Sequence, residues 1–154
     1  MRLCRAIAIA VVLLPAGSRA AASQSTAFTV SGDPSGPLTV TPNTDGTAGS
    51  VTSTRTTYSI SVTAASAKKI TGHLSAAMPA NTTLAVLFEV PPGATGVTSF
   101  GNVTLSTTPV TVITGFAQVS TLTGGIYYTF TATVAAGVVP ASSRTVTFTV
   151  SNAP

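Results

Sequence analysis

The chain has 154 residues, of which 44% are hydrophobic and only 6% are charged, and its formal net charge is +4. This balance excludes an intrinsically disordered chain, which combines low hydrophobicity with high charge. The length corresponds to one domain, and the basic balance raises nucleic acid or an anionic membrane surface as a partner.

The first 22 residues have the features of a secretory signal peptide. Arg2 and Arg5 give a positive start, an apolar run covers residues 6–14, and small residues at 20–22 form a cleavage site before Ser23. The apolar run is shorter than the about 20 residues that cross a bilayer, and no later stretch resembles a membrane span. We therefore expect one secreted domain, residues 23–154, located outside the cell, at the cell surface or in a periplasm. A buried N-terminal helix is the alternative.

Removal of the signal peptide changes the charge and the thiol content. Arg2, Arg5 and Arg19 leave with it. The mature chain then has four basic and three acidic residues, which gives a formal charge of +1. The only cysteine, Cys4, leaves as well, so the mature chain has no disulfide. Nucleic-acid binding is not expected, because it needs a basic stripe or stacking aromatic residues. The remaining basic residues are Arg55, Lys68, Lys69 and Arg144.

From Ser23 onward, apolar residues alternate with Thr or Ser, which is typical of strands with one buried and one solvated face. Turn residues separate these segments, at 32–37, 43–46, 91–96 and Gly124-Gly125. The pattern predicts an all-β fold, an antiparallel immunoglobulin-like β-sandwich of about eight to ten strands, with a β-barrel as the alternative. The predicted strands are 26–31, 37–41, 57–63, 68–74, 83–90, 101–106, 109–114, 116–122, 126–135 and 144–151.

The sequence contains few side chains of the types that catalyse reactions. His73 is the only histidine, and it is out of phase with Ile70 and Leu74, so we expect it to face solvent. No serine lies in a G-x-S-x-G context, which argues against a Ser–His–Asp triad. One histidine and no mature cysteine do not suffice for a zinc site.

The acidic residues do not form a catalytic pair. Asp33 and Asp45 lie in turn sequences, and Glu89 ends an apolar run, where we expect a solvated charge at a strand end. The spacing of Asn43 and Asp45 matches no calcium loop. We therefore predict a protein that is not an enzyme and has no cofactor or metal.

Three other features bear on partners. Lys68 and Lys69 are adjacent, and such a pair on a strand often protects a sheet edge. Tyr127 and Tyr128 are also adjacent, so one must face outward if both lie in one strand, and they are candidate ligand contacts in a chain without Trp. Residues 81–83 and 102–104 fit the N-glycosylation acceptor pattern.

The two ends of the domain carry similar alternating segments, Thr26–Val30 and Thr145–Val150. A terminal alternating strand can add to the sheet edge of a neighbouring molecule, which makes Phe28 and Val30 candidates for strand exchange. The alternative is that these segments are the first and last strands of one sandwich. The mature chain also contains 29 Thr and 16 Ser, which keep a surface soluble with little charge.

The signal peptide, the Thr-rich domain and the segments Phe28–Val30 and Arg144–Val150 resemble bacterial secreted β-sandwich proteins of the fimbrial-subunit or spore-coat type. The chain departs from fimbrial subunits in lacking a disulfide and a C-terminal aromatic residue. The resemblance implies an exported structural or adhesive surface protein that self-associates through its terminal strands. The alternative is an extracellular module that binds a glycan or another cell-surface polymer.

Overall fold

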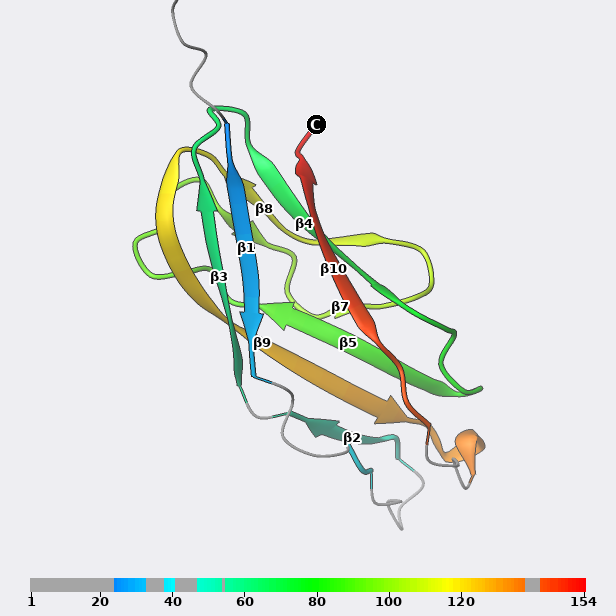
Figure 1. Ribbon diagram of the computed structural model, residues 1–154. Coiled ribbons are helices and arrows are strands. Elements are labelled where there is room, and N and C mark those ends of the chain that lie inside the picture. The colour runs from blue at the N-terminus through cyan, green and yellow to red at the C-terminus, as the bar shows by residue number, and fades with distance from the viewer. Residues whose placement is uncertain (1–23, 33–37, 41–46, 54, 138–141) are drawn as a thin grey trace, which may run out of the picture.

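A computed structural model of the chain describes residues 24–32, 38–40, 47–53, 55–137 and 142–154. In these residues the chain forms two antiparallel sheets that pack face to face (Figure 1). The predicted signal peptide, residues 1–22, lies outside the described residues, as do Asp33, Asn43 and Asp45.

The larger sheet has the strand order β1-β3-β9-β5-β7, and β2 pairs with β9. The smaller sheet has the order β10-β4-β8-β6. The larger sheet contains β1 (Thr26–Ser31), β2 (Gly49–Thr52), β3 (Thr56–Val62), β5 (Thr82–Phe88), β7 (Val103–Thr104) and β9 (Val119–Ala132). The smaller sheet contains β4 (Lys68–Leu74), β6 (Thr98–Ser99), β8 (Val110–Phe116) and β10 (Val146–Asn152), and a 3₁₀ turn covers Val134–Ala136.

The predicted antiparallel β-sandwich is confirmed, and the described residues form no closed barrel. Immunoglobulin-like sandwiches share this two-sheet architecture and vary in connectivity. Here every strand from β4 to β10 lies in the sheet opposite to that of the strand before it.

The core lies between the sheets and follows from the period-two pattern. Along β3, the side chains of Tyr58, Ile60 and Val62 are buried while the residues between them are partly exposed. An aromatic cluster joins the sheets, because Phe88 of β5 lies 4.9 Å from the Tyr58 ring and 4.9 Å from the ring of Phe148 in β10. The buried core residues are Tyr58, Ile60, Val62, Ala64, Ile70, Leu74, Leu84, Val86, Phe88, Leu105, Val112, Ile113, Phe116, Ile126 and Tyr128.

The predicted turn at Gly124-Gly125 is wrong. Both glycines lie inside the long strand β9, which replaces the two strands predicted at 116–122 and 126–135. Gly124 pairs with Tyr58 of β3, and a Cβ atom there would lie 2.5 Å from the Tyr58 ring. The glycine makes room for the aromatic side chain of the neighbouring strand, and it does not mark a turn.

Other predicted boundaries differ in smaller ways. The strands predicted at 26–31 and 68–74 are confirmed with the same boundaries as β1 and β4. The described part of the strand predicted at 37–41, residues 38–40, is not a strand. The strand predicted at 101–106 is reduced to β7, and the pattern missed the short strands β2 and β6.

Candidate functional site

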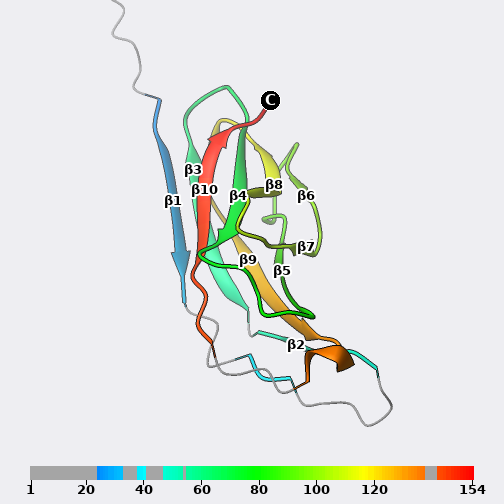
Figure 2. The same cartoon turned by 90° about the vertical axis from the view of Figure 1, so that its right-hand side faces the viewer.

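The two sides of the sandwich differ in the strands that end their sheets. On one side the sheets end in β6 and β7, which have two residues each. On the other side they end in β1 and β10, which have six and seven residues (Figure 2). Natural sheets commonly avoid unwanted pairing by keeping edge strands short or by placing Lys, Pro or a bulge there. Only the first side has such protection.

Within the described residues, the strand β1 pairs with one neighbour, β3, and its register with β3 has no bulge. Only Phe28 of its six residues is partly buried, and Val30 is 41% exposed. Thr63 donates its N–H to the carbonyl of Ser25 (3.0 Å), which sets the alternation of backbone bonds along this pair. Phe28 and Val30 therefore direct their backbone N–H and C=O groups away from β3, toward the free edge.

The strand β10 has the same character. Among the residues that the structure describes, it pairs only with β4, again without a bulge. Ser75 donates its N–H to the carbonyl of Thr145 (2.9 Å), so by the same alternation the backbone groups of Val146, Phe148 and Val150 point to the free edge. Neither β1 nor β10 contains a charged residue, a proline or a glycine.

A groove runs between β1 and β10, formed by two hollows of about 370 Å³ and about 410 Å³. Most of its apolar lining residues are alternate residues of the two strands, polar side chains line the rest, and Phe28 lines both hollows. The residues of the first hollow are Thr26, Phe28, Lys68, Val150, Ser151 and Asn152. Those of the second are Phe28, Val30, Gly32, Tyr128, Val146, Thr147 and Phe148.

The expectation that Lys68 and Lys69 protect a sheet edge is wrong. Both residues begin β4, which has β10 on one side and β8 on the other. The Lys68 ammonium donates a hydrogen bond to the Asn152 side-chain oxygen at the end of β10. The charge therefore lies one strand inside the sheet, and the edge strand itself stays uncharged.

The two candidate ligand-contact tyrosines point in opposite directions along β9. Tyr128 is 7% exposed, and its ring lies 6.5 Å from that of Phe148. Tyr127 is partly exposed on the outer face and interacts electrostatically with Arg55. Of the pair, only Tyr127 presents part of its side chain to the outer face of the larger sheet.

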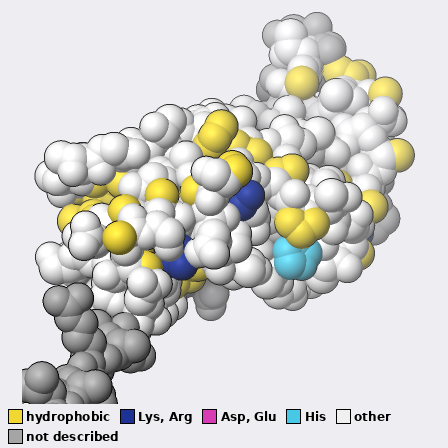
Figure 3. All heavy atoms as spheres, turned by 90° about the horizontal axis from the view of Figure 1, so that it is seen from above, with side chains coloured by type: hydrophobic (Ala, Val, Ile, Leu, Met, Phe, Trp, Pro, Cys, Tyr) yellow, Lys and Arg dark blue, Asp and Glu magenta, His cyan; other side chains and the backbone are white. Residues whose placement is uncertain are grey.

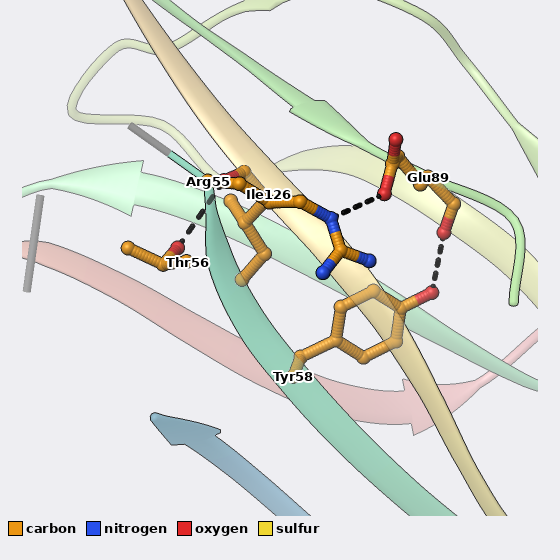
Figure 4. A network of polar contacts seen from close by, with 5 residues as sticks. All are labelled: Arg55, Thr56, Tyr58, Glu89 and Ile126. Carbon is orange, nitrogen blue, oxygen red and sulfur yellow. Dashed lines mark hydrogen bonds and ion pairs between the residues drawn. The ribbon is translucent and has the colours of Figure 1, made fainter. Parts of the chain in front are cut away.

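Arg55 also belongs to a polar cluster with Tyr58 and Glu89 that the sequence did not predict (Figure 4). The Nε of Arg55 lies 2.9 Å from Oε2 of Glu89, which directly follows β5. Tyr58 donates its hydroxyl proton to the carbonyl oxygen of Glu89 (2.7 Å). Both charged side chains are about 40% exposed, at 44% and 39%, so Glu89 is the partly solvated strand-end charge expected.

The electrostatics of this cluster follow from its geometry. The hydrogen bond from Arg55 to Glu89 raises the pKa of the guanidinium above its ordinary value. Burial raises the pKa of the Tyr58 phenol, and the negative charge of Glu89 acts in the same direction. The cluster joins three strands, because Tyr58 belongs to β3 and lies over Gly124 of β9. We interpret it as a clamp that fixes the end of β5.

His73 lies on the outer face of β4, as expected, and is partly exposed. In Figure 3 the histidine lies on a surface with isolated basic side chains and scattered apolar ones. Among the described residues, no group of three or more His, Cys, Asp or Glu side chains is placed to hold a metal ion.

The two sequences that fit the glycosylation pattern have different surroundings. Asn81 has a positive φ of 61°, and its side-chain amide donates to the carbonyl of Ala135 (3.1 Å). Asn102 is exposed in the short segment before β7.

Comparison with models of protein families, with curated proteins and with solved structures gave no match. Within the part of the chain that the structure describes, no helix is long and apolar enough to cross a membrane.

Proposed function

We propose that the chain is an exported, non-enzymatic structural or adhesive protein of the cell surface whose copies associate through the side formed by β1 and β10. The observation that carries the proposal is the contrast between the two sides of the sandwich. One side ends in two-residue strands, while the other presents two long, uncharged strands with free backbone edges. A long, flat edge strand without charge is a template for another strand.

The apolar side chains of β1 and β10 also favour association between copies. Phe28, Val30, Val146, Phe148 and Val150 are all partly exposed apolar side chains that line one groove. A second copy that covers them gains hydrophobic free energy, because apolar surface leaves water. The low charge of the domain, a formal +1 after loss of residues 1–22, weakens repulsion between copies.

Export is supported by the sequence of residues 1–22, with its basic start, apolar run and small residues before Ser23. The likeness to fimbrial-subunit and spore-coat proteins adds the structural or adhesive role. Exchange of β1 between copies, as suggested by Phe28 and Val30, is one form of this association, because β1 has only one neighbour and little buried surface.

The test measures molar mass by size-exclusion chromatography with light scattering over a range of concentrations. We expect the chain to form dimers or larger assemblies, and expect Thr29→Lys or Thr149→Lys to lower the assembled fraction at least tenfold. Both residues are exposed on the outer faces of the edge strands. The matched control is Thr83→Lys, because Thr83 is also exposed but lies on β5, which is not the last strand of its sheet. A chain that stays monomeric at every concentration contradicts the proposal.

A second candidate function is binding of a glycan or another surface polymer. The observation in its favour is Tyr127, which is partly exposed on the hydroxyl-rich outer face beside Arg55. Tyrosine rings beside polar groups are suited to sugar rings, since one side is apolar and the hydroxyl is polar. A glycan array with a hit that is lost in Tyr127→Ala and retained in Thr83→Ala would support this function over the first.

A further inference from the structure

We infer that two copies pair reciprocally, with β1 of each copy adding antiparallel to β10 of the other, and with Thr29 of one opposite Thr149 of the other. The inference rests on the proposed association and specifies its partner and register. The partner is a second copy of this chain, because each free edge of the molecule matches the other in length, polarity and side-chain pattern.

The backbone groups match first. Thr26, Phe28 and Val30 direct their N–H and C=O groups to the free edge of β1, as do Val146, Phe148, Val150 and Asn152 at β10. One register places Phe28 opposite Val150 and Val30 opposite Phe148. In this register the free backbone N–H and C=O groups of β1 form hydrogen bonds with the free backbone groups of the partner's β10. It pairs all six residues of β1 with residues 147–152 of the partner's β10.

The directions of β1 and β10, and the positions of their residues along the strand axis, also fit this pairing. Within one copy, β1 and β10 run in opposite directions (Figure 1). Thr26 lines the groove with Ser151 and Asn152, while Val30 lines it with Val146 and Thr147. A two-fold axis that is parallel to the strands and lies outside the groove does not change the direction of a strand or the position of its residues along the axis. It therefore brings β1 against the partner's β10 in the antiparallel sense and near the register given above.

The different positions of β1 and β10 at this side favour an axis parallel to the strands over one perpendicular to the sheets. Figure 2 shows β1 farther from the body of the sandwich than β10. An axis perpendicular to the sheets would place β1 against β1 and β10 against β10, so that the two projecting strands meet first. The axis parallel to the strands places each projecting β1 against the more recessed β10, and both strand pairs can form together.

The side chains are compatible with this pairing. On the inner side, Phe28 meets Val150 and Val30 meets Phe148, and aromatic and β-branched residues form favourable cross-strand pairs. On the outer side, Thr29 meets Thr149. No pair in this register brings two like charges together, because neither strand carries a charge.

The test uses disulfide formation between single-cysteine variants of the full chain. Cys4→Ser removes the only native thiol, and Thr29→Cys and Thr149→Cys are each introduced into that background. Opposite residues of a non-hydrogen-bonded antiparallel pair have Cα atoms about 4.5 Å apart, within the range that a disulfide can span. An equal mixture of the two variants is oxidised and run on a non-reducing gel.

We expect a disulfide-linked dimer in up to half of the chains of the mixture, and at least tenfold less in either variant alone. The matched control replaces Thr149→Cys by Thr71→Cys. Thr71 lies beside Thr149 but on the interior strand β4, which adds about 5 Å to the separation. That mixture should give no more dimer than the single variants.

Three results would overturn the inference while leaving association intact. A dimer from Thr149→Cys alone indicates pairing of β10 with β10, and one from Thr29→Cys alone indicates pairing of β1 with β1. A dimer from Thr29→Cys mixed with Ser59→Cys, but not with Thr149→Cys, indicates exchange of β1 onto the partner's β3, because Thr29 is opposite Ser59 in the register of β1 and β3. Monomers throughout, by light scattering, contradict the proposed function itself.

Discussion

Replacement of Gly124 by alanine tests the packing that holds the two sheets together. Gly124 lies inside β9 opposite Tyr58, and it has an ordinary strand conformation without a positive φ. Its new Cβ atom would lie 2.5 Å from Cε1 and 2.7 Å from Cζ and the hydroxyl oxygen of Tyr58. The ring has little room to withdraw, since Tyr58 is 1% exposed and lies 4.9 Å from the ring of Phe88.

Two effects of opposite sign decide the result. Alanine in place of glycine in a strand stabilises the fold by about 0.5–1 kcal/mol, because the unfolded chain loses freedom. Forcing an extra carbon against a packed ring costs about 1–3 kcal/mol, and the upper half of that range applies to a rigid aromatic side chain with packed neighbours. Packing therefore exceeds the backbone gain, and we expect a net loss of about 1.5 kcal/mol, equivalent to a fall in Tm of roughly 5 °C.

The assay is urea unfolding at low protein concentration, where association contributes least. Gly125→Ala is the matched control, since Gly125 is the next residue of the same strand and the three atoms nearest to its Cβ belong to the partly exposed side chains of Arg55 and Glu89. These flexible groups can move, so we expect a change within about 0.5 kcal/mol. In a Tyr58→Leu background the ring atoms are gone, and Gly124→Ala should then stabilise by about 0.5 kcal/mol. An unchanged loss in that background would refute the reasoning.

Two further predictions concern the cluster around Glu89. Tyr58→Phe removes the hydrogen bond to the Glu89 carbonyl (2.7 Å) and should cost about 1 kcal/mol near neutral pH. Because folding raises the pKa of Tyr58 above 10.0, its contribution is present below about pH 10 and is lost as the pH rises further, by up to about 1.4 kcal/mol per pH unit. Denaturant unfolding at alkaline pH should show a steeper loss for the wild type than for Tyr58→Phe, and equal slopes contradict this. Arg55→Ala should change the free energy of unfolding only slightly, because the ion pair with Glu89 is 44% and 39% exposed and solvent screens it, and a double-mutant cycle with Glu89→Ala checks this.

The fold class and the interior strands could be predicted from the sequence, because alternation reports directly which side chains are buried. The strand β4 shows this, since Ile70 and Leu74 are buried and His73, out of phase with them, is on the outer face. Gly124-Gly125 shows the limit of such prediction. Glycine suits a tight turn and also a strand position next to a bulky side chain, and only the pairing with Tyr58 distinguishes the two.

The candidate site was less predictable, because it depends on which strands become neighbours. The segments Thr26–Val30 and Thr145–Val150 could be recognised as alternating, but their shared groove depends on the order of strands in both sheets. The contact of Arg55 with Glu89 joins residues 34 positions apart through a strand pairing that no local pattern reports. The position of Lys68 inside the smaller sheet depends on the same order.

The connectivity also explains why the terminal strands are the ones available for association. The consecutive strands β3 and β4 lie in opposite sheets, and β1 and β10 each add to the free edge of one of them, so both terminal strands reach the same side of the sandwich. An interior strand such as β9 pairs with β2, β3 and β5, and moving it would break several ladders of hydrogen bonds. Each terminal strand pairs with only one neighbour in the described part of the chain. Rearranging this side therefore costs less free energy than moving an interior strand, and the apolar residues that it exposes give a second copy apolar surface to bury.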